Sequence, residues 1–416
     1  MATKLAVENL YKVFGSNPKE AMRRVHEGQG KAEIFEATGM TVGVADATFE
    51  VQESETFVVM GLSGSGKSTL VRMLNRLIEP TSGRVIINDK DITQMGRKQL
   101  VETRRRDISM VFQSFALMPH QTVLENAAFG LNVAGMDKSE REQRALSALD
   151  AVGLKANANS YPDELSGGMK QRVGLARALA VDPDVLLMDE AYSALDPLIR
   201  TEMQDELLRL QAERARTVIF ITHDLDEAMR VGDRIAIMEG GVVVQIGTPE
   251  EIVLSPANDY VRSFFHGVDV SRVFHARDIA KKREITVIER TGVSLRAALN
   301  RLEEHHEDYA VVHDRSGKYL GAVTTDSLHA CIKRQGADDK NGIDKAFVDA
   351  IKPVNGSMPL TEVMTFVADS SGPVPVIDDD SGEYLGTISK SALLKTLNRS
   401  EELSESGDEQ LEEAAS

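Results

Sequence analysis

The sequence predicts an α/β fold followed by a smaller α+β module. Residues 1 to about 265 alternate between short apolar runs, typical of buried parallel strands, and segments with helical periodicity. Two glycine-rich stretches interrupt this alternation, GLSGSGKS at residues 61–68 and LSGG at residues 165–168. From residue 277 the pattern changes to two similar strand–turn–strand units. We therefore expect a nucleotide-binding core with a helical subdomain, followed by an internal repeat.

The first glycine-rich stretch fits the phosphate-binding loop pattern G-x-x-x-x-G-K-[ST]. It lies between the apolar run Phe57–Met60 and a helix-like segment, residues 69–77, so the strand, loop and helix context is present. The glycines let backbone N–H groups turn toward phosphates, the lysine neutralises them, and the helix directs its positive end at them. We expect Ser68 to reach Mg²⁺ and the ATP-binding residues of this loop to be Gly61, Ser63, Gly64, Ser65, Gly66, Lys67, Ser68 and Thr69.

The second glycine-rich stretch precedes a pair of carboxylates. A small-residue turn that opens a helix is by itself an ordinary N-cap, so the position of this one decides its interpretation. An apolar run from Val185 follows and ends in Asp189 and Glu190, where a parallel sheet exposes catalytic groups; the alternative is a solvated acidic turn. We expect the second stretch to contribute to the same kind of nucleotide site through Ser166, Gly167 and Gly168.

Taken in this order, the motifs resemble those of the nucleotide-binding subunits of ABC transporters. The resemblance implies an ABC-type P-loop ATPase that works as a homodimer and uses ATP and Mg²⁺. It implies that Asp189 holds Mg²⁺ directly or through water, and that Glu190 is the general base that orients the attacking water. His223, after the apolar run 218–222, matches the switch histidine that touches the terminal phosphate.

The remaining family motifs are also present. Gln113 matches the Q-loop glutamine, which implies a Mg²⁺ contact, a place in the ATP site and a mobile link to a membrane partner. Ser193 and Asp196 match the D-loop that crosses between the two sites of the dimer. Phe14 matches the aromatic residue that stacks on adenine, and the nearby Tyr11 is the alternative.

One residue departs from the pattern of the family. Met169 stands where many ABC proteins carry glutamine after the two glycines. A thioether cannot donate the hydrogen bond of that glutamine. We expect activity to survive, because the phosphate contacts belong to Ser166 and to glycine N–H groups.

The composition disfavours several classes of function. A net charge of −17 argues against nucleic acid as a partner, because phosphate neutralisation by Lys and Arg supplies most of that affinity. The single cysteine, Cys331, leaves no internal disulfide and no cysteine-built metal site, and we expect it in a core. Aromatic residues make up 5% with no Trp, so a quaternary ammonium solute is expected to bind on another protein. No apolar stretch is long enough to cross a bilayer and no signal-peptide pattern is present, which predicts a cytosolic location.

The chain is expected to divide into four parts. The ATPase domain is predicted over residues 1–270, with a helical insertion at residues 16–41 and a mainly helical insert around residues 100–179. The strand–turn–strand units both contain the sequence YLG and resemble a tandem cystathionine-β-synthase (CBS) module, a reading for which two unrelated hairpins are the alternative. The predicted parts after the ATPase domain are repeat 1 over 277–334, repeat 2 over 343–399, and an acidic, disordered tail over 400–416.

The repeats lack the residues that grip a ribose in many CBS pairs. The resemblance places an acid three residues after a Thr or Ser, but Ser327 and Ala392 stand there, and Asp326 lies one residue early. We therefore assign no nucleotide-binding residues to this module.

The combination of an N-terminal helical insertion, an ABC ATPase and a CBS pair resembles the ATP-binding subunit of osmoregulated glycine betaine/proline betaine importers. The resemblance covers nearly the whole chain and implies uptake of glycine betaine, proline betaine or proline. It also implies integral membrane permease subunits, an external solute-binding protein and a peripheral position on the cytoplasmic face of the inner membrane. Two alternatives stay open: an importer for another small solute, such as an amino acid, with a nucleotide-controlled CBS module, and a soluble ABC ATPase acting on DNA or ribosomes.

A basic cluster opens the repeat region and suggests a regulatory hypothesis. It consists of Arg277, Lys281, Lys282 and Arg283. Such a cluster can hold an anionic lipid surface weakly and release it as salt shortens the Debye length, which would make the ATPase responsive to ionic strength. The alternative is a solvated helix face.

Overall fold

The computed structural model describes residues 2–265, 274–282, 287–289, 294–335, 342–370, 372–394 and 396. The chain separates into two compact units, Met1–Val261 and Arg262–Ser416. The first unit thus ends before residue 270, where the sequence places the end of the ATPase domain. The acidic tail and Arg283 lie outside the described residues.

The first unit is built on a six-stranded sheet in the order β10-β9-β3-β8-β7-β6. All neighbouring strands are parallel except β10 and β9, which are antiparallel. Every residue of β3, β7 and β8 is buried, as expected for central strands covered on both faces. The strands are β3 (Thr56–Met60), β6 (Ile108–Phe112), β7 (Val185–Asp189), β8 (Thr217–Thr222), β9 (Arg234–Glu239) and β10 (Val242–Gly247).

A four-stranded antiparallel sheet packs against the first, in the order β2-β1-β4-β5. Its strands are β1 (Thr3–Phe14), β2 (Thr41–Gln52), β4 (Ser82–Ile87) and β5 (Lys90–Asp91). One apolar core joins side chains of both sheets with those of α3 (Lys67–Leu74). Phe49 of β2 stacks on Phe57 of β3 with ring centroids 5.0 Å apart, which fixes one sheet against the other.

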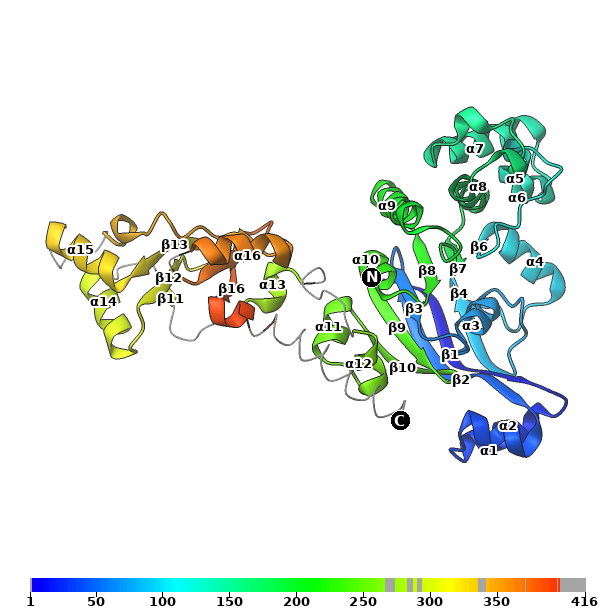
Figure 1. Ribbon diagram of the computed structural model, residues 1–416, viewed down its shortest axis with the longest axis horizontal. Coiled ribbons are helices and arrows are strands. Elements are labelled where there is room, and N and C mark those ends of the chain that lie inside the picture. The colour runs from blue at the N-terminus through cyan, green and yellow to red at the C-terminus, as the bar shows by residue number, and fades with distance from the viewer. Residues whose placement is uncertain are drawn as a thin grey trace. The chain divides into compact units, whose positions relative to one another are not determined.

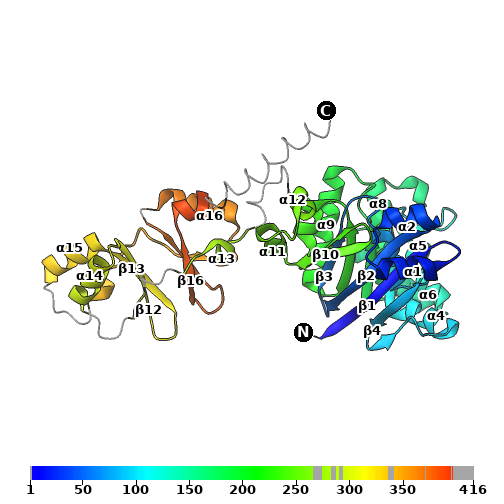
Figure 2. The same cartoon turned by 90° about the horizontal axis from the view of Figure 1, so that it is seen from below.

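The insertion at residues 16–41 forms two short helices, α1 (Pro18–His26) and α2 (Lys31–Thr38). They lie together beside the β1 and β2 ends (Figures 1 and 2). Ala21 and Ile34 are fully buried in a small cluster with β1 and β2 side chains. The chain leaves α2 through Gly39, which takes the left-handed conformation that glycine adopts without strain.

The insert predicted around residues 100–179 is mainly helical and contains one strand. The expected insert, residues 100–179, is interrupted by β6, which belongs to the six-stranded sheet. The helices α5–α8 form a group at one side of the first unit (Figure 1). The remaining helices of this unit are α4 (Arg97–Arg106), α5 (Val123–Ala127), α6 (Phe129–Val133), α7 (Lys138–Ala151), α8 (Gly167–Ala180), α9 (Pro197–Glu213), α10 (Leu225–Val231) and α11 (Pro249–Leu254), and α12 (Asp259–Ser263) follows at the boundary between the units.

The described residues of the second unit form two three-stranded sheets of the same plan, β11-β12-β13 and β14-β15-β16. In each, the first pair is parallel and the second antiparallel, which is the internal repeat expected from the sequence. Cys331 is fully buried in the core of the first repeat. The strands are β11 (Val287–Glu289), β12 (Tyr309–His313), β13 (Tyr319–Thr324), β14 (Val354–Asn355), β15 (Val374–Ile377) and β16 (Tyr384–Ile388); the helices include α14 (Leu295–Glu304), α15 (Thr325–Gln335) and α16 (Leu360–Asp369).

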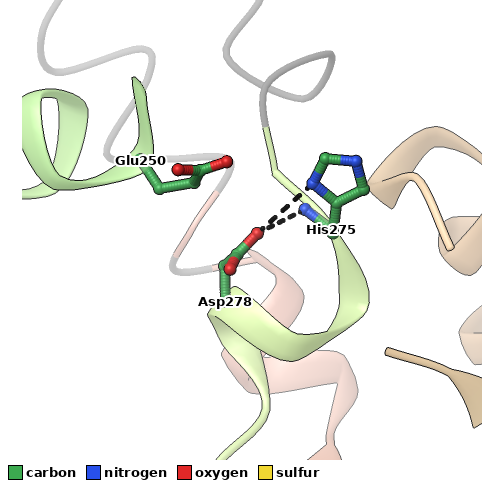
Figure 3. Close-up of side chains that lie close together, drawn as sticks. All are labelled: Glu250, His275 and Asp278. Carbon is green, nitrogen blue, oxygen red and sulfur yellow. Dashed lines mark hydrogen bonds and ion pairs between the residues drawn. The ribbon is translucent and has the colours of Figure 1, made fainter. Parts of the chain in front are cut away.

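The segment that opens the predicted first repeat pairs with the second repeat instead. The helix α13 (Ala276–Ile279) contacts β14, β15 and β16, and Lys281 forms a two-bond bridge with Thr387 of β16. Asp278 caps α13, because its Oδ2 accepts from the His275 backbone N–H at 2.7 Å and lies 3.6 Å from His275 Nδ1 (Figure 3). The second repeat is therefore completed by residues that precede the first.

Candidate nucleotide site

The site lies at the carboxyl edge of the six-stranded sheet, where three central strands end in register. Met60 of β3 pairs with Thr222 of β8, and Asp189 of β7 pairs with Ile221 of β8. The residues that follow these strands are therefore brought to one edge, as expected for a doubly wound sheet. They are the phosphate loop after β3, Glu190 after β7 and His223 after β8.

Two glycines of the phosphate loop, Gly61 and Gly66, are required by close approach of the backbone. At Gly61, with φ +150°, an added Cβ would lie 2.3 Å from the Met238 carbonyl oxygen of β9. At Gly66, with φ +105°, it would lie 2.3 Å from the Gly43 carbonyl oxygen of β2. The loop is thus held tightly between the two sheets, and larger residues at these positions would displace it.

Lys67 is buried at the start of α3 and points back along the loop. Its Nζ donates to the carbonyl oxygens of Gly61 at 2.7 Å and Leu62 at 3.0 Å, and it lies 3.9 Å from Glu190 Oε1. Burial lowers the pKa of Lys67, while the negative charges of Glu190 and Asp189 act in the opposite direction. The ammonium therefore stands between the loop carbonyls and the carboxylates.

The two carboxylates differ in their surroundings. Asp189 is buried; its Oδ2 accepts from the Arg72 guanidinium at 3.2 and 3.3 Å, whereas its Oδ1 has no hydrogen-bond partner among the described residues. Glu190 takes a positive φ of 47°, a conformation that costs a non-glycine residue about 1 kcal/mol or more. Its backbone N–H donates to the Ile221 carbonyl oxygen at 3.1 Å, which holds this turn and directs the side chain toward the loop.

Glu190 is contacted by His223 and Ser193, and Ser193 is in turn contacted by Gln113. The His223 Nδ1 lies 3.7 Å from Glu190 Oε2. Gln113 donates from Nε2 to Ser193 Oγ at 3.2 Å, and Ser193 donates from Oγ to the Glu190 carbonyl oxygen at 2.9 Å. The Q-loop and D-loop residues predicted from the sequence are therefore linked through the turn that holds Glu190.

A cavity of about 360 Å³ opens beside the phosphate loop. Phe14 is 41% exposed and lines it, whereas Tyr11 is half-buried and packs edge-on against His26. Of the two aromatic residues expected near adenine, Phe14 is thus the one that faces the cavity. The lining residues are Phe14, Lys31, Thr41, Gly43, Ser63, Gly64, Gly66, Lys67, Ser68, Thr69 and Glu190.

Three of these lining residues were not expected from the sequence: Lys31, Thr41 and Gly43. Phe14 pairs with Thr41 across β1 and β2, and an added Cβ at Gly43 would lie 2.8 Å from the Phe14 ring. For Thr41 and Gly43 the sequence does contain an indication. The insertion starts directly after Phe14, so the residues at its ends must lie near this aromatic ring. No pattern in the sequence pointed to Lys31.

The signature residues 166–168 do not line the cavity. Ser166 caps α8, with its Oγ accepting from the Met169 N–H at 3.3 Å. Gly168 is required by packing, because an added Cβ would lie 2.5 Å from Ile199 Cγ2 of α9. Asp196 caps α9 by accepting from the Ile199 N–H at 3.1 Å. Within one chain, the signature is therefore separate from the phosphate loop.

Comparisons with known proteins agree with this arrangement. The family model "ABC transporter" matches residues 44–193. The chain is 55% identical over 400 residues to the glycine betaine/proline betaine transport system ATP-binding protein ProV of Escherichia coli (strain K12), covering 96% of this chain and 98% of that protein. It is 49% identical to the glycine betaine transport ATP-binding protein OpuAA of Bacillus subtilis (strain 168), covering 95% and 92%. A bacterial ABC transporter cassette solved as a dimer is similar in structure, with a TM-score of 0.50 and 31% identity over 59% of this chain and 98% of that chain.

The chain belongs to the ATP-binding subunits of the glycine betaine/proline betaine family of ABC transporters. This confirms the family, the P-loop ATPase fold and the ATP-hydrolysing activity predicted from the sequence. The solved cassette covers 59% of the chain, so the fold comparison bears on the ATPase part. Among the described residues, no helix combines the length and the apolar character needed to span a bilayer.

Proposed function

We propose that this subunit hydrolyses ATP to drive the uptake of glycine betaine, proline betaine or proline across the cytoplasmic membrane. The observation that carries the proposal is the 55% identity over 96% of the chain together with the convergence of Lys67, Glu190 and His223 at one sheet edge. Other relatives are named for transport of carnitine and of trimethylamine N-oxide, which share a methylated nitrogen with the betaines. These names favour this solute class over other amino acids, and a transporter over an ATPase that acts on DNA or ribosomes.

Two copies of the chain would enclose each ATP. The triphosphate would lie between residues 61–69 of one subunit and residues 166–168 of the other, with the D-loop residues Ser193 and Asp196 at the seam. The separation of the signature from the cavity within one chain supports this arrangement, because half of the pocket is then missing from a single subunit. A solved relative was also obtained as a dimer bound to ADP and Pi.

Hydrolysis would use the groups around Glu190. Glu190 would take the proton of the attacking water, and His223 would contact the terminal phosphate. Lys67 and the N–H groups of the loop would hold the phosphates, and Phe14 would stack on adenine.

The donor set fits a magnesium ion. The unpartnered Asp189 Oδ1 is a hard, anionic oxygen, and Ser68 and Gln113 add neutral oxygen ligands. Bound Mg²⁺ would supply neutralisation of the phosphate charge, and Asp189, Ser68 and Gln113 would hold it.

Hydrogen bonds connect α8, the helix that begins at the signature residues 166–168, with the segment that follows the Q-loop residue Gln113. Arg177 of α8 donates to the carbonyl oxygens of Ala116 at 2.5 Å and Phe115 at 3.1 Å. The guanidinium of Arg177 is largely withdrawn from water, and this desolvation lowers the pKa of Arg177. We expect residues 115–122 to receive a helix of the membrane permease, so movement of α8 on ATP binding would reach the permease through Arg177.

The second unit would regulate transport as a tandem CBS module, with one repeat within residues 277–334, the other within residues 343–399, and α13 packed on the second of them. Its two matching sheets support this proposal. Of the basic cluster, Arg277 is engaged with Asp379 at 3.1 Å, Lys281 and Lys282 are exposed, and Arg283 lies outside the described residues. Lys281 and Lys282 are therefore the described members able to meet an anionic lipid surface.

The function is tested by recovering the chain from membranes with its permease and solute-binding partners and measuring ATP turnover in proteoliposomes. We expect stimulation by glycine betaine or proline betaine and none by methionine. Stimulation by methionine alone would contradict the proposed solute class. Failure to recover any integral membrane partner would contradict the transporter itself.

A further inference from the structure

The helical insertion brings a second ammonium group to the phosphate loop. Lys31 is the first residue of α2, and its Nζ donates to the Gly64 carbonyl oxygen at 3.2 Å. It lines the same cavity as Lys67 and Phe14 although it lies 33 positions from Gly64 in the sequence. The loop therefore meets one cation from its own helix and one from the insertion.

The position of Lys31 is fixed by the fold of the insertion. Ile34, one turn further along α2, is fully buried in the cluster that joins the insertion to β1 and β2. The Glu33 carboxylate accepts from the Gly30 N–H at 3.1 Å, which holds the first turn of α2 at the point where Lys31 leaves it. The backbone that carries Lys31 is thus held by a buried anchor and a capped helix start, and the bond with Gly64 holds the ammonium.

The bonding of Lys31 leaves capacity for an anion. An ammonium has three N–H donors, and the structure shows one of them bonded, to Gly64. Within the described part of the chain, no carboxylate pairs with Lys31, whereas Lys67 has Glu190 at 3.9 Å. A half-buried cation that faces a cavity without an acidic partner is suited to a polyanion.

We propose that Lys31 is a second phosphate-binding cation of the ATP site, delivered by the insertion hairpin, and that it favours nucleotides in proportion to their number of phosphates. The proposal rests on the nucleotide site described above, because it adds a residue to that site. On nucleotide binding, Lys31 exchanges its bond with Gly64 for bonds with phosphate oxygens. Nucleotide binding at the site and structural ordering of the hairpin formed by α1 and α2 then depend on each other.

The test is nucleotide titration of the full-length Lys31→Ala variant with ATP, ADP, AMP and inorganic tripolyphosphate. Loss of one charge-assisted contact predicts an affinity about tenfold weaker for ATP and for tripolyphosphate, a smaller loss for ADP and none for AMP. Lys31→Arg is expected to recover most of the ATP affinity, because it restores the charge. The matched control is Lys19→Ala, which removes an exposed lysine of the same hairpin and is expected to leave all four affinities unchanged.

Two results would overturn the proposal. Equal losses for ATP, ADP and AMP would mean that Lys31 only holds the loop in place, and unchanged affinities would mean that it does not contact the ligand. The Lys67→Ala variant separates these failures from failure of the site itself. If Lys67→Ala abolishes ATP binding while Lys31→Ala has no effect, only the role of Lys31 is wrong; if neither variant changes ATP binding, the phosphate loop is not the nucleotide site.

Discussion

The Nδ1 of His223 lies 3.7 Å from Oε2 of Glu190, although the two residues follow different strands. Glu190 follows β7 and His223 follows β8. Because these two strands are parallel and in register, both side chains lie at the same edge of the sheet. An imidazole at this distance can orient the carboxylate and also reach a phosphate that lies beside it. The pair therefore forms the centre of the proposed hydrolytic site.

We expect Glu190→Gln to lower ATP turnover by about 100-fold or more, because the amide cannot accept the proton of the attacking water. ATP binding should persist, so the variant should accumulate as an ATP-bound dimer when saturated with MgATP. Steady-state hydrolysis and light scattering measure the two effects. Glu102→Gln, at an exposed position on α4, is the control and should behave as wild type. Normal turnover, or a variant that stays monomeric with MgATP, would contradict the paired site.

The parts of this site that belong to sequence motifs could be predicted, because each motif determines its own backbone conformation through residues that are close together in the sequence. The phosphate loop, Glu190 and His223 directly follow apolar runs, and neighbouring parallel strands bring such positions to one edge of the sheet. Lys31 could not be predicted, because its contact with Gly64 depends on how the insertion packs on β1 and β2. The same holds for β6 inside the predicted helical insert, and for Lys281, whose bridge to Thr387 depends on pairing with a strand more than a hundred residues away.

Gly168→Ala should destabilise the ATPase unit, because the added Cβ would lie 2.5 Å from Ile199 Cγ2 and force α8 from α9. We expect a loss of about 1–3 kcal/mol in the free energy of unfolding, as for other overpacked sites. In an Ile199→Ala background the same change should cost much less, and chemical denaturation of the four proteins of this cycle measures the difference. Gly167→Ala is the control, since its Cβ would come no closer than 4.0 Å to Leu195. Equal costs in both backgrounds would show that the contact with Ile199 is not the reason for glycine.

Arg177→Met should uncouple hydrolysis from transport. The change removes both bonds to the backbone of Phe115 and Ala116, so the proposed permease-contacting segment loses its connection with α8. We expect basal ATPase activity of the isolated subunit to be retained, and transported solute per ATP in proteoliposomes to fall several-fold. Arg105→Met, at an exposed position on α4, is the control. Unchanged transport per ATP would remove the proposed coupling route.

Neutralising the basic cluster should abolish activation by salt, if the cluster holds an anionic membrane surface. The variant carries Lys281→Ala, Lys282→Ala and Arg283→Ala, and each lost charge should remove about 1 kcal/mol of attraction to such a surface. ATP-driven transport is measured in liposomes of fixed anionic lipid content as the ionic strength is raised. Lys352→Ala, an exposed lysine of the same unit, is the control. A salt response identical to that of wild type would eliminate lipid sensing by this cluster.

The burial of the Glu227 carboxyl predicts how the free energy of unfolding depends on pH. It is buried on α10, where it accepts hydrogen bonds from Thr222 and Gln204 and faces the charges of Asp224 and Arg200. Burial raises the pKa of Glu227 above its ordinary value of 4.5, the repulsion of Asp224 acts in the same direction, and the hydrogen bonds and Arg200 act against both.

The direction of the pH effect follows from proton binding. Well below pH 4.5 the carboxyl is protonated in both states and contributes no pH dependence. As the pH rises, the unfolded chain releases this proton first while the folded protein retains it, so the free energy of unfolding contributed by Glu227 falls until the pH passes the raised pKa. Glu227→Gln has no proton to release, so it should flatten the profile in this window and gain stability relative to wild type toward neutral pH. Differential scanning calorimetry between pH 4.5 and 8 measures the difference, and parallel profiles for the two proteins would show that the Glu227 carboxyl titrates alike in the folded and unfolded states.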